Sequence, residues 1–224
     1  MKRVLFVVAH PDDAELAAGG TIRMLADSGA EVKVLTLTIS EKSEAMRKAR
    51  KKAAREAARV LKYELAWYEE GRFDHVEEIR THELVQYLDR LVESFSPDSV
   101  FSHWEGDSHW DHVCAAKAVK ASSRRWNASL YALPPNEIRT VAYTSFTPNT
   151  FVDISPYIKA KMEAISHYSY PGQHFKAVNG EEYKALNRSI GLMANCEFAE
   201  SFLLIRQNGL FLNGHGINGS HIAL

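Results

Sequence analysis

The stretch Val4-Leu5-Phe6-Val7-Val8-Ala9-His10-Pro11-Asp12-Asp13-Ala14-Glu15 decides how the rest of this chain is interpreted. Its first half is an almost unbroken apolar run, which is typical of a strand buried on both faces of a parallel sheet. The next segment, Ala14–Gly29, has the pattern of a helix that ends at a glycine. The turn between them carries an imidazole and two adjacent carboxylates at the carboxyl end of a strand, where open α/β sheets bind ligands. We therefore expect a divalent-metal site here, with one acid or base to spare.

The bulk composition is that of an ordinary soluble domain. The chain has 224 residues, of which 46% are hydrophobic and 25% charged, and its formal net charge is −1. This fits one domain and gives no reason to expect a nucleic-acid partner. No stretch is apolar enough for a membrane span and no signal peptide is evident, so we expect no membrane association and a cytoplasmic location. Cys114 and Cys196 lie far apart, as expected for free thiols in a reducing compartment.

Strand and helix patterns alternate along the first half of the chain. Strands are expected at Lys2–Ala9, Glu31–Thr38, Glu64–Tyr68 and Ser99–Ser102, and helices at Ala14–Gly29, Lys42–Lys62, Val76–Phe95 and Trp110–Ser123. This alternation predicts a single-domain, Rossmann-like α/β fold with a mostly parallel sheet and helices on both faces. The basic run Arg47–Arg55 is interpreted as a solvated helix face rather than as a binding surface.

The second half is less regular. Strands are expected at Ala128–Leu133, Thr140–Ser145, Thr150–Ile154 and Ser201–Ile205, and helices at Pro156–Ser169 and Gly180–Asn195. We expect the domain to span residues 1–206, with residues 207–224 as a loop or tail of the same domain.

A second cluster of imidazoles and carboxylates occurs in the segment 103–112, which again follows a strand and precedes a helix. Because parallel strands end at the same edge of a sheet, this loop and the His10 loop should share one rim. His10, Asp13 and His112 would supply two imidazoles and one carboxylate, a donor set that suits catalytic zinc and also iron(II) or another divalent metal. The spare carboxylate beside such a metal is a natural general base.

These two motifs resemble the signature of the LmbE-like/PIG-L family of zinc-dependent N-deacetylases. The first match is Ala9–Glu15 with Gly19-Gly20, and the second is His109-Trp110-Asp111-His112. Weaker similarities follow at Lys161 and at Ala199-Glu200-Ser201-Phe202, so the resemblance extends to about residue 206.

The resemblance implies a role for each motif residue. It assigns His10, Asp13 and His112 as zinc ligands and Asp12 as the general base. It assigns His109 as the general acid or oxyanion partner, oriented by Asp111. The implied reaction is the removal of an N-acetyl group from a small amino sugar, such as an N-acetylglucosamine conjugate, by metal-activated water.

Other interpretations stand beside this one. The turn at His10 could cap a helix, and the chain could be an inactive metal-binding domain or a nucleotide-binding α/β module, although the first loop lacks GxGxxG. Substrate contacts are not readable, and the weak candidates are Arg124, Arg125 and Arg139. Glu15 and His103 are interpreted as structural residues. The expected partner is a small N-acetylated molecule, and a homo-oligomer is left open.

Overall fold

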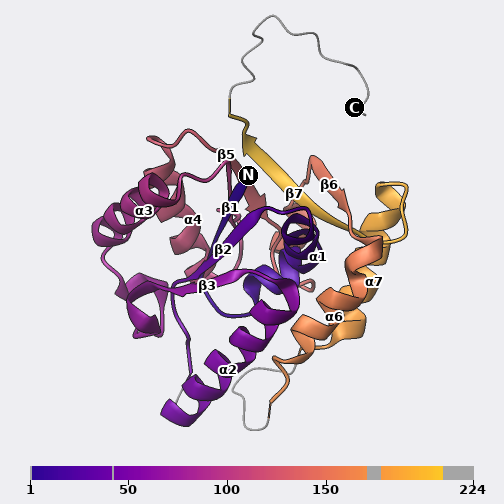
Figure 1. Ribbon diagram of the computed structural model, residues 1–224, viewed down its shortest axis with the longest axis horizontal. Coiled ribbons are helices and arrows are strands. Elements are labelled where there is room, and N and C mark those ends of the chain that lie inside the picture. Colours follow the sequence, from indigo (N-terminus) through magenta and orange to yellow (C-terminus); the bar gives the residue numbers. More distant parts are fainter. Residues whose placement is uncertain (1, 42, 171–177, 209–224) are drawn as a thin grey trace, which may run out of the picture.

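A mostly parallel sheet forms the centre of the molecule (Figure 1). The computed structural model describes residues 2–41, 43–170 and 178–208. Within them, seven strands lie in the order β3-β2-β1-β4-β5-β7-β6. Their bounds are β1 Arg3–Val8, β2 Glu31–Thr36, β3 Glu64–Trp67, β4 Ser99–His103, β5 Ser129–Leu133, β6 Thr150–Asp153 and β7 Ala199–Arg206. Strand β7 runs antiparallel to β5 and β6, and the other pairs are parallel, which confirms the predicted fold class.

Helices cover both faces of this sheet (Figure 1). Their bounds are α1 Asp13–Asp27, α2 Glu44–Leu61, α3 Thr81–Phe95, α4 Trp110–Ser123, α5 Val141–Ser145, α6 Ile158–Ser166 and α7 Gly180–Met193. Short 3₁₀ turns lie at η1 Tyr68–Gly71, η2 Val76–Glu78 and η3 Ser155–Tyr157. Helices α1, α2 and α6 share one apolar core with the sheet, and α3 and α4 share the other. The two cores account for the strongly apolar β1, because each of its faces packs against one of them.

Helix α2 shows how the charged sequence of this region builds a buried face. Its buried face is formed by Ala53, Ala54, Ala57, Ala58 and Leu61, while most of its charged side chains lie outside. Arg50 is the exception, because only 4% of this residue is exposed. The interpretation of Arg47–Arg55 as a solvated face is therefore wrong at Arg50.

One predicted strand is a helix. The β-branched residues of Thr140–Ser145 favoured a strand, but Val141–Ser145 forms the short helix α5. Thr140 is its N-cap, and the Thr140 side chain accepts a hydrogen bond from the Tyr143 N–H. A threonine that caps a helix competes with the strand conformation that its β-branch favours. The predicted helix Val76–Phe95 forms two separate elements. The 3₁₀ turn η2 covers Val76–Glu78, and the helix α3 begins only at Thr81.

The order of the strands places a crevice at one edge of the sheet. From β1, the chain continues to β2 on one side, while β4 lies on the other side. The loops that leave β1 and β4 are therefore neighbours at the carboxyl edge. In open α/β sheets this reversal of strand order marks the ligand site.

A buried ion pair supports the first helix at a break. Ala18 has non-helical dihedral angles, so α1 is kinked there. The N–H groups of Gly20 and Thr21 donate to the two carboxylate oxygens of Glu200, at 2.9 and 2.8 Å. Lys161 Nζ lies 2.7 Å from Glu200 Oε1, and both side chains are almost completely buried. Lys161 and Glu200, which belong to the weaker sequence similarities, thus lie in one cluster that caps the second half of α1.

Gly20 is required for this close approach. A Cβ atom at Gly20 would lie 2.6 Å from Cβ of Ile154, far inside van der Waals contact. The glycine therefore lets the segment that leads into η3 pack directly on α1.

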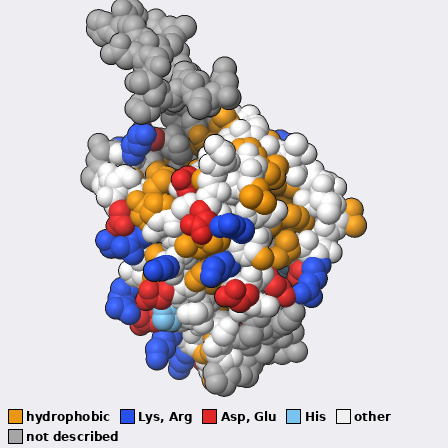
Figure 2. All heavy atoms as spheres, turned by 90° about the vertical axis from the view of Figure 1, so that its right-hand side faces the viewer, with side chains coloured by type: hydrophobic (Ala, Val, Ile, Leu, Met, Phe, Trp, Pro, Cys, Tyr) orange, Lys and Arg blue, Asp and Glu red, His pale blue; other side chains and the backbone are white. Residues whose placement is uncertain are grey.

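The surface on the side of α6 and α7 carries hydrophobic side chains between charged ones (Figure 2). On α7, Leu192 and Met193 are largely exposed. The homo-oligomer that the sequence left open stays a prediction.

No helix among the described residues is long and apolar enough to cross a membrane. The expected tail, from residue 209 onward, lies outside the described part of the chain.

Candidate metal centre

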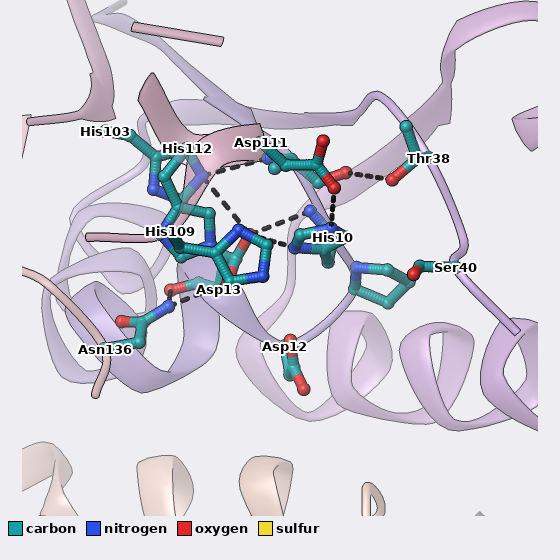
Figure 3. A network of polar contacts seen from close by, with 12 residues as sticks. His10, Asp12, Asp13, Thr38, Ser40, His103, His109, Asp111, His112 and Asn136 are labelled. Carbon is teal, nitrogen blue, oxygen red and sulfur yellow. Dashed lines mark hydrogen bonds and ion pairs between the residues drawn. The ribbon is translucent and has the colours of Figure 1, made fainter. Parts of the chain in front are cut away.

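Two loops at the carboxyl edge of the sheet bring the predicted ligands together (Figure 3). His10 follows β1, Asp13 begins α1, and His112 lies in the first turn of α4. All three residues are buried. His10 Nδ1 lies 3.5 Å from Asp13 Oδ2, and His112 Nε2 lies 3.3 Å from Asp13 Oδ1. These two contacts involve different oxygens of Asp13. Among the described residues, the donor sets in which every ligand atom lies within 4.8 Å of the others are His10, His109 and His112, and Asp13, His103 and His112.

Each of the two imidazoles is oriented by a carboxylate on its other nitrogen. His10 Nε2 lies 3.0 Å from Asp111 Oδ2, and His112 Nδ1 lies 2.8 Å from Asp107 Oδ2. With these nitrogens as donors, His10 Nδ1 and His112 Nε2 are the nitrogens that face Asp13. This is the usual arrangement of metal-binding histidines, in which an outer carboxylate fixes the tautomer and ring orientation.

Asp111 contacts a different histidine from the one that the sequence predicted. The sequence predicted that Asp111 orients His109, but its carboxylate accepts the Val76 N–H and contacts His10 and His75. Sequence reasoning also missed Asp107. The spacing of Asp107 and His112, five residues apart across a helix start, gave no signal that they would meet.

The electrostatics of the cluster favour a cation between its carboxylates. Burial works against the charged form of His112, but Asp13 and Asp107 raise the His112 pKa to about 10. Burial would raise the pKa of Asp13, yet the charge of His112, the largest opposing influence, holds it well below its usual range. Carboxylates that hold a proton so firmly on an imidazole also attract a metal cation to that position.

His103 lies beside the cluster but is less suited to binding a metal. It could join Asp13 and His112 by distance alone. However, His103 Nε2 accepts the Ala9 N–H at 2.9 Å, which occupies its lone pair. Burial, followed by the charge of His112, lowers the pKa of His103 to about 4, so this ring is neutral. The structure thus agrees with a structural role for His103.

The outer carboxylates allow a direct test of this arrangement. Asp107→Asn and Asp111→Asn are each expected to weaken metal binding about 10- to 100-fold, because each leaves one ligand imidazole without its charged partner. The measurement is metal competition against a chromophoric chelator. Asp98→Asn is the control, since Asp98 contacts the Arg3 N–H, 95 residues away in the sequence and outside this cluster. Unchanged affinity in both variants would contradict the assigned orientation.

Asp12 is separated from the imidazole group. Its carboxylate points away from that group (Figure 3) and lines the adjacent cavity. Asp12 has φ 98°, a left-handed conformation that turns its side chain away from that of Asp13. Both Asp12 oxygens lie 3.4 Å from an Arg50 guanidinium nitrogen. Burial raises the pKa of Asp12 to about 7, with Arg50 opposing the shift.

Arg50 is the second residue that sequence reasoning missed. Its guanidinium donates to the backbone carbonyls of Ile39, Ser40 and Pro11, in addition to its contact with Asp12. It therefore joins the loops that follow β1 and β2. The surrounding basic run concealed this role.

His109 lies at the open side of the cluster. Its ring stacks on His112, with centroids 4.4 Å apart, and lies 5.0 Å from the His10 ring. Burial, followed by the charges of His112 and His10, lowers the His109 pKa. Its backbone N–H donates to Asp107, so the same carboxylate positions both histidines of the motif.

A cavity of about 290 Å³ opens beside the cluster. Its far wall is formed by Asn136 and Arg139, from the segment after β5, and by Glu182 and Tyr183 on α7. Asn136 Nδ2 donates to Asp13 Oδ1 at 2.8 Å, which holds this wall against the candidate metal centre.

Of the three candidate arginines, the structure places only Arg139 at this cavity. Arg124 and Arg125 follow α4 at the end opposite His112, and they line a different hollow. As substrate contacts at this site they are therefore wrong.

Glu15 anchors the loop that follows β1 through two buried hydrogen bonds. Its Oε1 accepts the hydroxyls of Tyr63 and Tyr168, both at 2.6 Å. Burial raises the pKa of Glu15, against the opposing effect of these two hydrogen bonds. These contacts agree with a structural role.

Comparisons with known proteins identify the family. The model of the PIG-L family, described as GlcNAc-PI de-N-acetylase, matches residues 5–123. The diacetylchitobiose deacetylase of Thermococcus kodakarensis is 30% identical over 186 residues, which cover 74% of this chain and 68% of that protein. The chain belongs to the PIG-L, or LmbE-like, family.

Solved structures share the fold. The N,N'-diacetylchitobiose deacetylase from Pyrococcus horikoshii aligns with a TM-score of 0.74 and 22% identity, over 91% of this chain and 84% of its own. The 4-carboxy-2-hydroxymuconate hydratase from Pseudomonas putida aligns with a TM-score of 0.77 and 21% identity, over 94% and 98%. Because proteins named for two different reactions have this fold, the reaction must be argued from the site.

Proposed function

We propose that this protein is a metal-dependent N-deacetylase that hydrolyses the acetamido group of a small amino sugar, such as an N-acetylglucosamine conjugate, to acetate and a free amine. The observation that carries the proposal is the convergence of His10 Nδ1, His112 Nε2 and the Asp13 carboxylate beside a cavity. Membership of the PIG-L family and the deacetylase names of its relatives support it.

Zinc is the metal that the donor set suits best. Two imidazoles and one carboxylate are a catalytic zinc set that leaves one position for water, and iron(II) is the alternative. His10, Asp13 and His112 would hold the ion. When bound, it would polarise the acyl carbonyl and lower the pKa of a bound water.

The chain's own residues supply the proton transfers. Asp12 lines the cavity and accepts the proton of the attacking water, while Arg50 fixes the Asp12 carboxylate. His109, at the open side of the cluster, donates an N–H to the developing oxyanion. The proton held by Asp12 then passes to the departing amine.

Acetate release tests the proposal. The purified protein, loaded with zinc, is incubated with methyl N-acetylglucosaminide and N,N'-diacetylchitobiose, and acetate is measured. Chelation should abolish release, and added zinc should restore it. A chelated, metal-free protein that keeps its full rate would contradict the metal requirement. A zinc-loaded protein that hydrolyses no N-acetyl amino sugar would support a binding domain instead.

A further inference from the structure

The far wall of the cavity is fastened by two contacts between elements that are distant in sequence. An Arg139 guanidinium nitrogen lies 2.6 Å from Glu182 Oε1. The Tyr183 hydroxyl donates to the Asn136 carbonyl at 2.9 Å. Together these contacts join the segment after β5 to the first turn of α7. Arg139 is therefore held in the wall by Glu182.

The positive charges of the cavity are engaged by the protein itself. Among the described residues that line it, the arginines are Arg50 and Arg139. Arg50 is buried and donates to three carbonyls besides its contact with Asp12. Arg139 is paired with Glu182. A phosphate or carboxylate on a substrate would have to displace one of these partners.

Negative charge exceeds positive charge around the cavity. The carboxylates among the described lining residues are Asp12, Asp13, Asp107, Glu137 and Glu182. A divalent cation at the candidate metal centre would bring these charges close to balance, because burial also raises the pKa of Asp12 to about 7. The described lining therefore offers no net positive charge to attract an anion, and it accepts a neutral group.

The N-terminus of α7, which borders the cavity, is also a poor site for an anion. A helix N-terminus normally attracts negative charge. Here the Asn179 side chain accepts the Glu181 N–H, and Glu181 and Glu182 occupy the first turn. The positive end of the helix is thus already compensated by this chain's own side chains.

From these observations we infer that the site selects amino sugars whose other substituents are uncharged, and that Glu182 determines this specificity by engaging Arg139. The inference rests on the proposed deacetylation and names its substrate class: neutral N-acetylaminoglycosides rather than sugar phosphates or sugar acids.

Matched substrates test the inference. The zinc-loaded protein is assayed with methyl N-acetylglucosaminide, N-acetylglucosamine 1-phosphate and N-acetylglucosamine 6-phosphate, so that the charge is placed at either end of the sugar. The kcat/KM of the methyl glycoside is expected to exceed that of both phosphates. A wild-type protein that hydrolyses either phosphate with equal or greater kcat/KM would overturn the inference.

Variants then test the role of Glu182. Glu182→Gln releases Arg139, so the phosphate-to-neutral ratio of kcat/KM should rise about 1.5- to five-fold, the range set by one exposed ion pair. Arg139→Gln should lower that ratio by a similar factor. Glu197→Gln is the matched control, because Glu197 pairs with Arg188 on the outside of α7 and should leave the ratio unchanged. An unchanged ratio in Glu182→Gln would overturn the role of Glu182.

Binding separates this inference from the proposed function. If no sugar is hydrolysed, the proposed function fails, but calorimetry with the zinc-loaded wild-type protein still compares the methyl glycoside with the 1-phosphate. Tighter binding of the methyl glycoside would support the charge preference. Tighter binding of the 1-phosphate would overturn it.

Discussion

Asp12→Asn is expected to lower kcat for acetate release by about 10²- to 10⁴-fold while the protein still binds its metal ion. Asparagine has the shape of aspartate but cannot accept a proton at neutral pH. Asp12 also points away from the imidazole group, so its replacement leaves the donor atoms in place (Figure 3). The measurement pairs initial rates of acetate release with the metal content of the same samples.

Asp13→Asn is the matched comparison, because it changes the neighbouring carboxylate in the same way. This variant should lose the metal as well as the activity, since Asp13 lies between the two ligand imidazoles. The division of roles would be wrong if Asp12→Asn lost the metal, or if it kept the full rate of hydrolysis.

Lys161→Met is expected to lower the free energy of unfolding by about 3–5 kcal/mol, because it leaves a buried carboxylate without its counter-charge. Lys161 is 1% exposed, and Glu200 would keep only the N–H groups of Gly20 and Thr21 as partners. Urea unfolding, followed by circular dichroism, measures the change.

Lys159→Met is the control on the same helix. Lys159 is exposed, so the free energy of unfolding should change by less than about 0.5 kcal/mol. The double variant Lys161→Met/Glu200→Gln should recover part of the loss, because it removes the unpaired charge. A Lys161→Met protein as stable as the control would show that Glu200 does not depend on the ion pair.

Most of the fold could be predicted because its signals are local. The apolar run of β1 and the alanine stripe of α2 each follow from the pattern of one segment. The predicted strand at Thr140–Ser145 was wrong because β-branched residues favour strands, whereas capping by Thr140 depends on the local backbone.

The residues of the candidate site could be named from the sequence where they lie in a motif. The structure brings together His10, Asp13 and His112 because parallel strands share an edge. Arg50 and Asp107 were missed because their roles depend on contacts between separate segments or across a turn. Such contacts leave no periodic pattern, and a buried arginine within a basic helix has the same sequence signature as an exposed one.

The cap that Glu200 provides for α1 has a consequence for biosynthesis. The hydrogen bond between Gly20 and Glu200 spans 180 residues, so the N-terminal helix emerges from the ribosome long before its cap exists. Contacts of such separation form late and carry a large loop-closure cost. A nascent chain shorter than about 200 residues therefore carries the complete His10-Pro11-Asp12-Asp13 motif on a helix that is still uncapped at its break. Docking of β7, the last described strand, supplies the cap of α1 at this break.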